Sequence, residues 1–184
     1  MIGSDGVQDA AGLPRGTRLG VDVGDVRVGL ARSDLDGMIA TPVETLERGT
    51  ALQRIVHEAR ELEARVIMVG LPRSLDGSEG AAAGKARAFA GELAGLVAQD
   101  PRTIEVRLLD ERLTTVSAHR AMHASGRKGR KHRQVVDQVA AVMILQQALD
   151  IERSRGERAG ERVEVDPAPS DGTDGEGSRE GEAR

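Results

Sequence analysis

The chain has 184 residues, with no cysteine, tryptophan or tyrosine. This length suits a single domain, and the lack of cysteine excludes disulfides, a cysteine nucleophile and thiolate metal sites. No segment approaches about 20 consecutive apolar residues, and no basic stretch followed by an apolar run opens the chain. We therefore predict no transmembrane helix, no secretory signal and no membrane partner, and we expect a cytoplasmic protein.

The net charge of −4 is unevenly distributed along the chain. Residues 156–184 carry nine acids against four arginines, a net charge of −5, which leaves +1 for the remainder. The acidic overall balance is therefore no argument against a nucleic-acid substrate. Phe89 is the only phenylalanine, so stacking of bases on aromatic rings is nearly excluded. Any bound nucleic acid must be held mainly through its phosphates.

The predicted elements follow the order βββαβαβαα. A loose leader over residues 1–16 precedes the first strands, and a disordered acidic tail over 155–184 follows the last helix. Period-2 alternation and short apolar runs predict strands, and apolar residues at helical spacing predict helices. The predicted strands are 17–24, 26–34, 39–46, 65–70 and 103–109. The predicted helices are 51–64, 79–99, 114–124 and 134–153, with a basic loop over 125–133 before the last helix.

An acid interrupts the first predicted strand, where Asp22 lies between Gly20 and Gly24. Because side chains alternate along a strand, Asp22 shares its face with these glycines, and Val21 and Val23 lie on the other face. Burying a bare carboxylate is costly, so such an acid usually holds a metal, a proton or a strong donor. The alternative is an ordinary turn or hydrogen-bonding acid.

The chain resembles the YqgF/RuvX family in four motifs that follow one another in order. These are G-x-D-x-G-x-x-R-V-G-L-A at 20–31, V-G-L-P with D-G-S at 69–78, D-E-R-L-T-T at 110–115, and D-Q-V-A-A at 137–141. The first motif also opens actin-like ATPases and sugar kinases, but those need about twice this length. The resemblance implies an α/β, ribonuclease H-like domain over residues 17–154. Its mixed five-stranded sheet has a three-strand antiparallel meander plus parallel strands, and helices flank it.

Three acidic positions can meet in this topology, because sites gather at the carboxyl ends of parallel strands. Asp22 lies in the first strand, Asp110 and Glu111 end the fifth, and Asp137 begins the last helix. Asp137 heads an apolar stripe, so we expect it to face the sheet. That stripe contains Ala140, Ala141, Ile144 and Ala148. The alternatives are a helix-start acid at Asp137 and a solvated strand end at 110–111.

Carboxylates gathered in this way favour a hard cation, Mg²⁺ or Mn²⁺. The family resemblance implies that Asp22, Glu111 and Asp137 are the metal ligands and catalytic residues. Asp110 and Glu111 face opposite ways on a strand, and we favour Glu111 because its longer side chain suits a strand end. Coordination by Asp110 stays open.

Basic residues near these acids are candidates for binding nucleic acid. Arg27 and Arg112 either contact phosphates or only pair with the acids. The run at 126–133 contains five positive charges and no acid, and it directly precedes the last helix. Its basic residues, predicted to bind phosphates, are Arg127, Lys128, Arg130, Lys131 and Arg133. The alternative is an ordinary flexible surface loop.

The resemblance implies a nuclease that trims the 5′ end of the precursor of small-subunit ribosomal RNA, in ribosome biogenesis. One alternative is a Holliday junction resolvase, which would need a symmetric dimer to make paired cuts. The other is a non-catalytic binding protein associated with RNA or transcription. The expected partner is structured RNA, with branched DNA as the alternative, and we expect a monomer or a weak homodimer.

Overall fold

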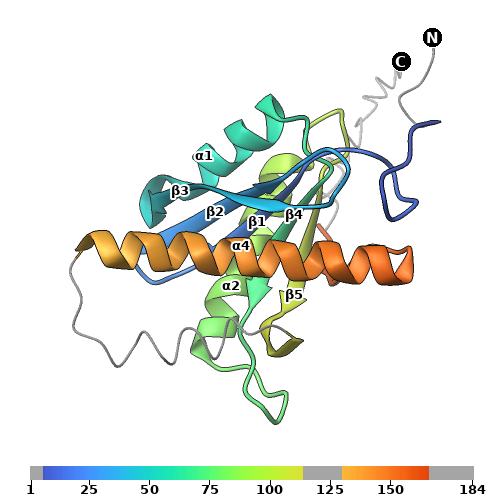
Figure 1. The fold of residues 1–184 in the computed structure, drawn as a ribbon. Coiled ribbons are helices and arrows are strands. Elements are labelled where there is room, and N and C mark those ends of the chain that lie inside the picture. Colours follow the sequence, from blue (N-terminus) through green and yellow to red (C-terminus); the bar gives the residue numbers. More distant parts are fainter. Residues whose placement is uncertain (1–5, 114–129, 166–184) are drawn as a thin grey trace, which may run out of the picture.

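A computed structural model describes residues 6–113 and 130–165, with the backbone alone for residues 113 and 130–135. Its strands form one sheet in the order β3-β2-β1-β4-β5-β6 (Figure 1). The strands are β1 (Arg18–Val23), β2 (Arg27–Ser33), β3 (Ala40–Glu47), β4 (Val66–Leu71), β5 (Glu105–Asp110) and β6 (Glu161–Arg162). The helices are α1 (Arg48–Glu61), α2 (Ala81–Val97) and α4 (Arg130–Arg155), with a short 3-10 helix, η2 (Glu111–Leu113).

The pairing of the strands confirms the predicted fold class. β1, β2 and β3 form an antiparallel meander, and β1, β4 and β5 are parallel. This is the ribonuclease H-like order that the sequence predicts. The parallel strands place the carboxyl ends of β1, β4 and β5 at one end of the sheet, where sites of open α/β sheets gather.

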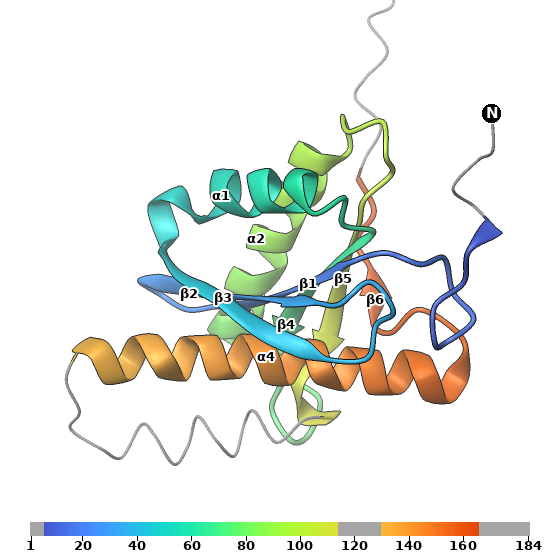
Figure 2. The ribbon, with the colours of Figure 1, turned by 45° about the horizontal axis from the view of Figure 1, so that its top comes forward.

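The sheet lies between two helical layers, with α1 and α2 on one face and α4 on the other (Figure 2). Each face has its own apolar core. The α1/α2 core contains Val21, Leu30 and Phe89, and the α4 core contains Met68, Leu109 and Ile144. Asp22 lies one residue after Val21 and therefore points toward the α4 side, as predicted.

Helix α4 lies unusually close to the sheet because glycines face it. A Cβ at Gly20 would lie 2.6 Å from the Cβ of Leu145, and a Cβ at Gly70 would lie 2.5 Å from Cδ1 of Ile144. A Cβ at Gly29 would lie 2.7 Å from the carbonyl carbon of Asp137 and closer still to its oxygen. Any side chain at these positions would push the helix away.

The start of α4 differs from the prediction. The helix begins at Arg130, so the last part of the predicted basic loop is helical and Asp137 lies inside the helix. Gly129 is the last glycine of the basic run, and the residues after it are good helix formers. The predicted helix at 114–124 lies outside the described residues.

Residues 6–16 are anchored to the domain, although the sequence predicts a loose leader over 1–16. Asp9 pairs with the fully buried Arg18, whose Nη2 also lies 3.2 Å from Oε2 of Glu152. Arg158 Nη1 lies 3.0 Å from the same oxygen. Buried charges are costly unless they are paired, and this cluster supplies the pairs across segments that are distant in sequence.

The predicted tail begins too early. Residues 161–162 form a sixth strand on the edge of β5, and Val163 donates a 2.9 Å hydrogen bond to the carbonyl of Val106. Arg107 also donates to the carbonyl of Ala159 at 2.7 Å. The domain therefore includes residues up to 165, and the sheet has six strands where five were predicted. None of the described helices is long and apolar enough to cross a membrane.

Gly29→Ala should lower the free energy of unfolding by about 2 kcal/mol or more, because the new methyl group would collide with the main chain of α4. Urea denaturation measures this change. Gly91→Ala is the matched control, since a Cβ at that position in α2 has no atom within 4 Å apart from its chain neighbours and the backbone of its own helix. Gly91→Ala should raise the free energy of unfolding by about 0.5 to 1 kcal/mol, because alanine favours the helix more than glycine does. Equal stability of the two variants would contradict the close approach of α4.

Candidate active site at the carboxyl ends of β1, β4 and β5

Asp22 lies near the carboxyl end of β1 and is only 5% exposed. It pairs across the sheet with Gly29 of β2, and α4 passes over Gly29 at close range. Val21 pairs with Val69 of β4, which makes Asp22 and Gly70 the next residues along these two parallel strands. The carboxylate of Asp22 is thus enclosed on the α4 side of the sheet.

Glu111 reaches the same place from the end of β5. It is the first residue of η2, and its side chain is 2% exposed. Oε1 of Glu111 would collide with a Cβ at Gly70, at less than 3.0 Å. The missing side chain of Gly70 therefore leaves the space that the Glu111 carboxylate occupies, over the strand next to Asp22.

Asp137 comes from α4, at the point where the helix crosses β2. Its main-chain carbonyl covers Gly29, the strand partner of Asp22. Its carboxylate accepts a 3.1 Å hydrogen bond from Nε of Arg27, at the start of β2. The structure therefore brings together the three elements that carry Asp22, Glu111 and Asp137, with the Asp137 side chain directed to Arg27.

Burial changes the acidity of Glu111. Loss of solvent, and secondarily the charge of Asp110, raises the pKa of the Glu111 carboxyl from 4.5 to about 7. Around neutral pH the metal-free protein therefore holds a proton on Glu111 in part of its molecules. A bound cation would favour the ionised carboxylate, which links metal affinity to pH.

Asp110 has a different environment from Glu111. Nη2 of Arg112 lies 2.7 Å from its carboxylate, and Nη1 of Arg73 lies 3.4 Å away. The hydrogen bonds from Arg112 lower the pKa of Asp110. Its charge is thus balanced by guanidinium groups at the surface, whereas Glu111 is enclosed on the α4 side. This contrast favours Glu111 over Asp110 as a metal ligand, in agreement with the preference drawn from the sequence.

The donor set fits a hard divalent cation, because the enclosed groups are carboxylates and Gly70 leaves a cradle for one of them. Within the described ranges, no three acidic or histidine side chains already form a compact ligand cluster. The carboxylate of Asp137 is instead paired with Arg27. Asp137 would have to share its carboxylate between Arg27 and a cation, which its two oxygens allow.

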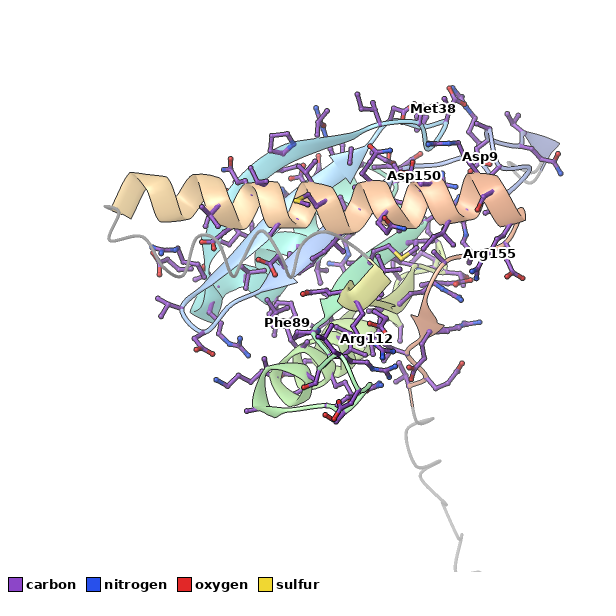
Figure 3. All side chains as sticks on the ribbon, turned by 60° about the horizontal axis from the view of Figure 1, so that its bottom comes forward. Asp9, Met38, Phe89, Arg112, Asp150 and Arg155 are labelled. Carbon is purple, nitrogen blue, oxygen red and sulfur yellow. The ribbon has the colours of Figure 1, made fainter. Side chains whose placement is uncertain are left out.

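The predicted phosphate-binding residues are only partly placed. Arg27 pairs with Asp137, and Arg112 pairs with Asp110. Pairing with the acids was one of the two predicted roles of these arginines, and phosphate contact was the other. Figure 3 shows Arg112 beside the β4–α2 loop. The basic run falls outside the described side chains. Its predicted residues are Arg127, Lys128, Arg130, Lys131 and Arg133.

An ion-pair network that the sequence did not predict holds the β4–α2 loop. Glu79 pairs with Arg73 and Arg87, at 2.7 Å each, and Arg87 also reaches Glu161 of β6 at 3.1 Å. The hydrogen bonds from Arg87 and Arg73 lower the pKa of Glu79 to about 2. No spacing rule links these residues, because they come from a loop, a helix and an edge strand.

The free energy of unfolding of the metal-free protein should fall as pH rises from about 4.5 to 7. In this window folded Glu111 binds more protons than unfolded Glu111, so its contribution is complete below pH 4.5 and lost above 7. The fall from this group is at most about 3 kcal/mol. Chemical denaturation at several pH values, with a chelator present, measures it.

Glu111→Gln should remove most of this fall. Asp110→Asn is the control, and it should keep most of the fall because burial is the larger cause of the raised pKa. A Glu111→Gln protein with the same pH dependence as the wild type would show that Glu111 is not the group responsible.

Comparisons with known proteins identify the family of this chain. The RuvX family model, described as Holliday junction resolvase, matches residues 16–151. A protein of Streptomyces avermitilis is 53% identical over 157 residues, which cover 84% of this chain and 98% of that protein. A protein of a Nocardioides species is 55% identical over 155 residues, which cover 81% of this chain and 97% of that protein. Both are named "Putative pre-16S rRNA nuclease".

Among solved structures, Thermus thermophilus RuvC in complex with a Holliday junction substrate is similar with a TM-score of 0.49. It is 12% identical, and the match covers 80% of this chain and 99% of that one. The family model spans most of the chain, and the two relatives match it over nearly their whole length. The chain therefore belongs to the RuvX family.

Proposed function

We propose that this protein is a divalent-metal-dependent endonuclease that processes the 5′ end of pre-16S ribosomal RNA. The observation that carries the proposal is the meeting of two buried carboxylates, Asp22 and Glu111, with the helix that bears Asp137. Enclosing neighbouring acids does not stabilise a fold, because their negative charges repel one another. The names of relatives about half identical to this chain support pre-16S rRNA as the substrate.

Asp22, Glu111 and Asp137 would hold Mg²⁺ or Mn²⁺. When bound, such ions activate water and stabilise the leaving oxygen of a phosphodiester. The protein fixes the position of its ligands through rigid elements: Asp22 through the paired strand β1, Glu111 through its seat on Gly70, and Asp137 through α4. Burial also excludes bulk water, which strengthens the interaction of the carboxylates with a cation.

Phosphates of the substrate would be held by arginine and lysine side chains around the acids. Arg27 and Arg112 lie at this end of the sheet and are partly exposed, so each can exchange its carboxylate partner for a phosphate. Phe89 is buried in the α1/α2 core and cannot stack on a base. Binding should therefore depend strongly on salt and weakly on sequence.

Resolution of Holliday junctions is the second candidate, because the matching family model carries that description. Paired cuts would need a symmetric dimer. The non-catalytic binding protein is disfavoured by the enclosed acids, which add nothing to the affinity for a polyanion. The cytoplasmic location and the monomeric or weakly dimeric state stay predictions.

Asp22→Asn should abolish metal-dependent cleavage of a pre-16S RNA fragment and leave the melting temperature unchanged or raised, because one of several repelling carboxylates is neutralised. The activity is measured as cleavage of this RNA with Mg²⁺ or Mn²⁺, and a four-way DNA junction is included as a competing substrate. Full activity of the purified Asp22→Asn protein would contradict the mechanism. Preferential cleavage of the junction would favour the resolvase.

Asp110→Asn is the matched control for the ligand after β5. It should retain far more activity than Glu111→Gln at limiting Mg²⁺, because Asp110 is engaged with Arg112 and Arg73. Equal losses would indicate that both acids coordinate, and the reverse order would assign the metal to Asp110.

Replacing Arg127, Lys128, Arg130 and Lys131 by Ala should weaken RNA binding and lower the slope of log K against log salt. Each phosphate contact that is lost should lower the slope by about 0.7 to 0.9. Turnover at saturating RNA should fall much less, because these residues are proposed to hold phosphates. Fluorescence anisotropy at several salt concentrations measures both quantities.

Deletion of residues 166–184 is the control. It removes six acids and two arginines and leaves β6 in place. Binding by the truncated protein should be equal or slightly tighter. A basic-run variant with wild-type affinity and slope would make this segment an ordinary surface loop.

A further inference from the structure

Leu75 stands out on the surface of the described part of the chain. Its side chain is 96% exposed, more than any other exposed large hydrophobic residue described there. It lies in the loop at residues 72–80 between β4 and α2, which projects beyond the sheet next to η2 (Figure 1). Glu111 begins η2, so Leu75 is presented at the end of the sheet that carries the candidate active site.

The loop holds Leu75 in a defined turn. Gly77 donates a 2.8 Å hydrogen bond to the carbonyl of Ser74, and Ser74 donates one of 3.0 Å to the carbonyl of Ser78. Asp76 accepts hydrogen bonds from the amide and the hydroxyl of Ser78, at 2.9 and 2.7 Å. Gly77 has a φ of 88°, which favours glycine. A rigid turn loses little conformational entropy when its tip makes a contact.

Ion pairs fix this turn relative to the acids. Arg73 bridges Glu79 and Asp110, at 2.7 and 3.4 Å. Arg112 holds Asp110 from the other side, and its Nη1 lies 3.1 Å from a Cβ placed at Gly77. Arg73 and Arg112 therefore connect the turn that carries Leu75 to Asp110, the residue before Glu111.

The chemistry around Leu75 fits a nucleic acid better than a protein. Its neighbours in the turn, Ser74, Asp76 and Ser78, are polar, whereas protein-docking surfaces are contiguous apolar patches. The guanidinium groups of Arg73 and Arg112 suit phosphates. Leucine is one of the apolar side chains that insert between base steps in nucleic-acid complexes.

We propose that Leu75 is a positioning residue that inserts against a nucleobase where a duplex of the substrate is interrupted, and so places the scissile phosphate at the acids. This inference rests on the proposed function. No phenylalanine, tyrosine or tryptophan is exposed among the described residues, since Phe89 is 3% exposed, and Leu75 is the most exposed large apolar side chain there.

The test uses hairpin RNAs with a 5′ single-stranded extension and 2-aminopurine at successive positions across the duplex end. A four-way DNA junction labelled in the same way is the second arm. With Ca²⁺ in place of Mg²⁺, the wild-type protein should raise the fluorescence at one position, because that base loses its stacking. Leu75→Ala should abolish the rise and increase Kd about tenfold, which corresponds to about 1.4 kcal/mol.

Two features separate this role from a phosphate contact or a structural role. The salt slope and the melting temperature of Leu75→Ala should equal those of the wild type, because the side chain is uncharged and exposed. Leu75→Met should restore the fluorescence rise and come within about twofold of the wild-type Kd, since methionine is also an inserting side chain. Leu35→Ala, at an exposed turn near the other end of the sheet, is the control and should behave as wild type.

A Leu75→Ala protein with wild-type Kd and fluorescence profile, in a preparation whose wild type cleaves, would overturn this inference alone. Failure of Leu75→Met to restore the fluorescence rise would also overturn it. A wild-type protein that neither binds nor cleaves RNA or DNA would overturn the proposed function and this inference together. A fluorescence rise on the junction alone would assign the insertion to branched DNA.

Discussion

The close approach of α4 to the sheet is the constraint on which the rest of the structure depends. Glycines at positions 20, 29 and 70 face the helix, and a side chain at any of them would displace it. This contact fixes Asp137 over β2, next to the strand that carries Asp22, and Gly70 leaves room for the carboxylate of Glu111. The same three residues therefore set the packing of one core and the geometry of the candidate site.

The site places stability and function in opposition. Burial of Glu111 disfavours its charged form, and the pKa of its carboxyl rises accordingly. Arg27 offsets part of the negative charge through Asp137, and a divalent cation would offset the rest. Asp110 avoids the conflict because Arg73 and Arg112 balance it at the surface. In the proposed function, a cation balances the remaining charge of these acids.

The sequence predicted the features that depend on local pattern. Alternation around Asp22 gave its face of the sheet correctly, and the strand order followed from the pattern of elements. Features that depend on distant partners were missed. The leader was predicted to be loose because no sequence pattern near Asp9 indicates its pairing with Arg18. Glu152, another partner of Arg18, is far away in sequence. Likewise, residues 156–165 look like a polar tail, but β6 pairs with β5 and Arg87 binds Glu161. The site acids came from motifs and topology, whereas the pairing of Arg27 and Arg112 needed coordinates.

The central claim is that Asp22, Glu111 and Asp137 share a divalent cation. Anomalous diffraction from crystals soaked in Mn²⁺ tests it most directly, because the signal locates the ion without any assumption about activity. The account predicts anomalous density on the α4 side of the sheet, at coordination distance of about 2 to 2.3 Å from oxygens of all three acids. Density at Asp110 in place of Glu111, or no ordered Mn²⁺ at these acids at saturating concentration, would contradict it.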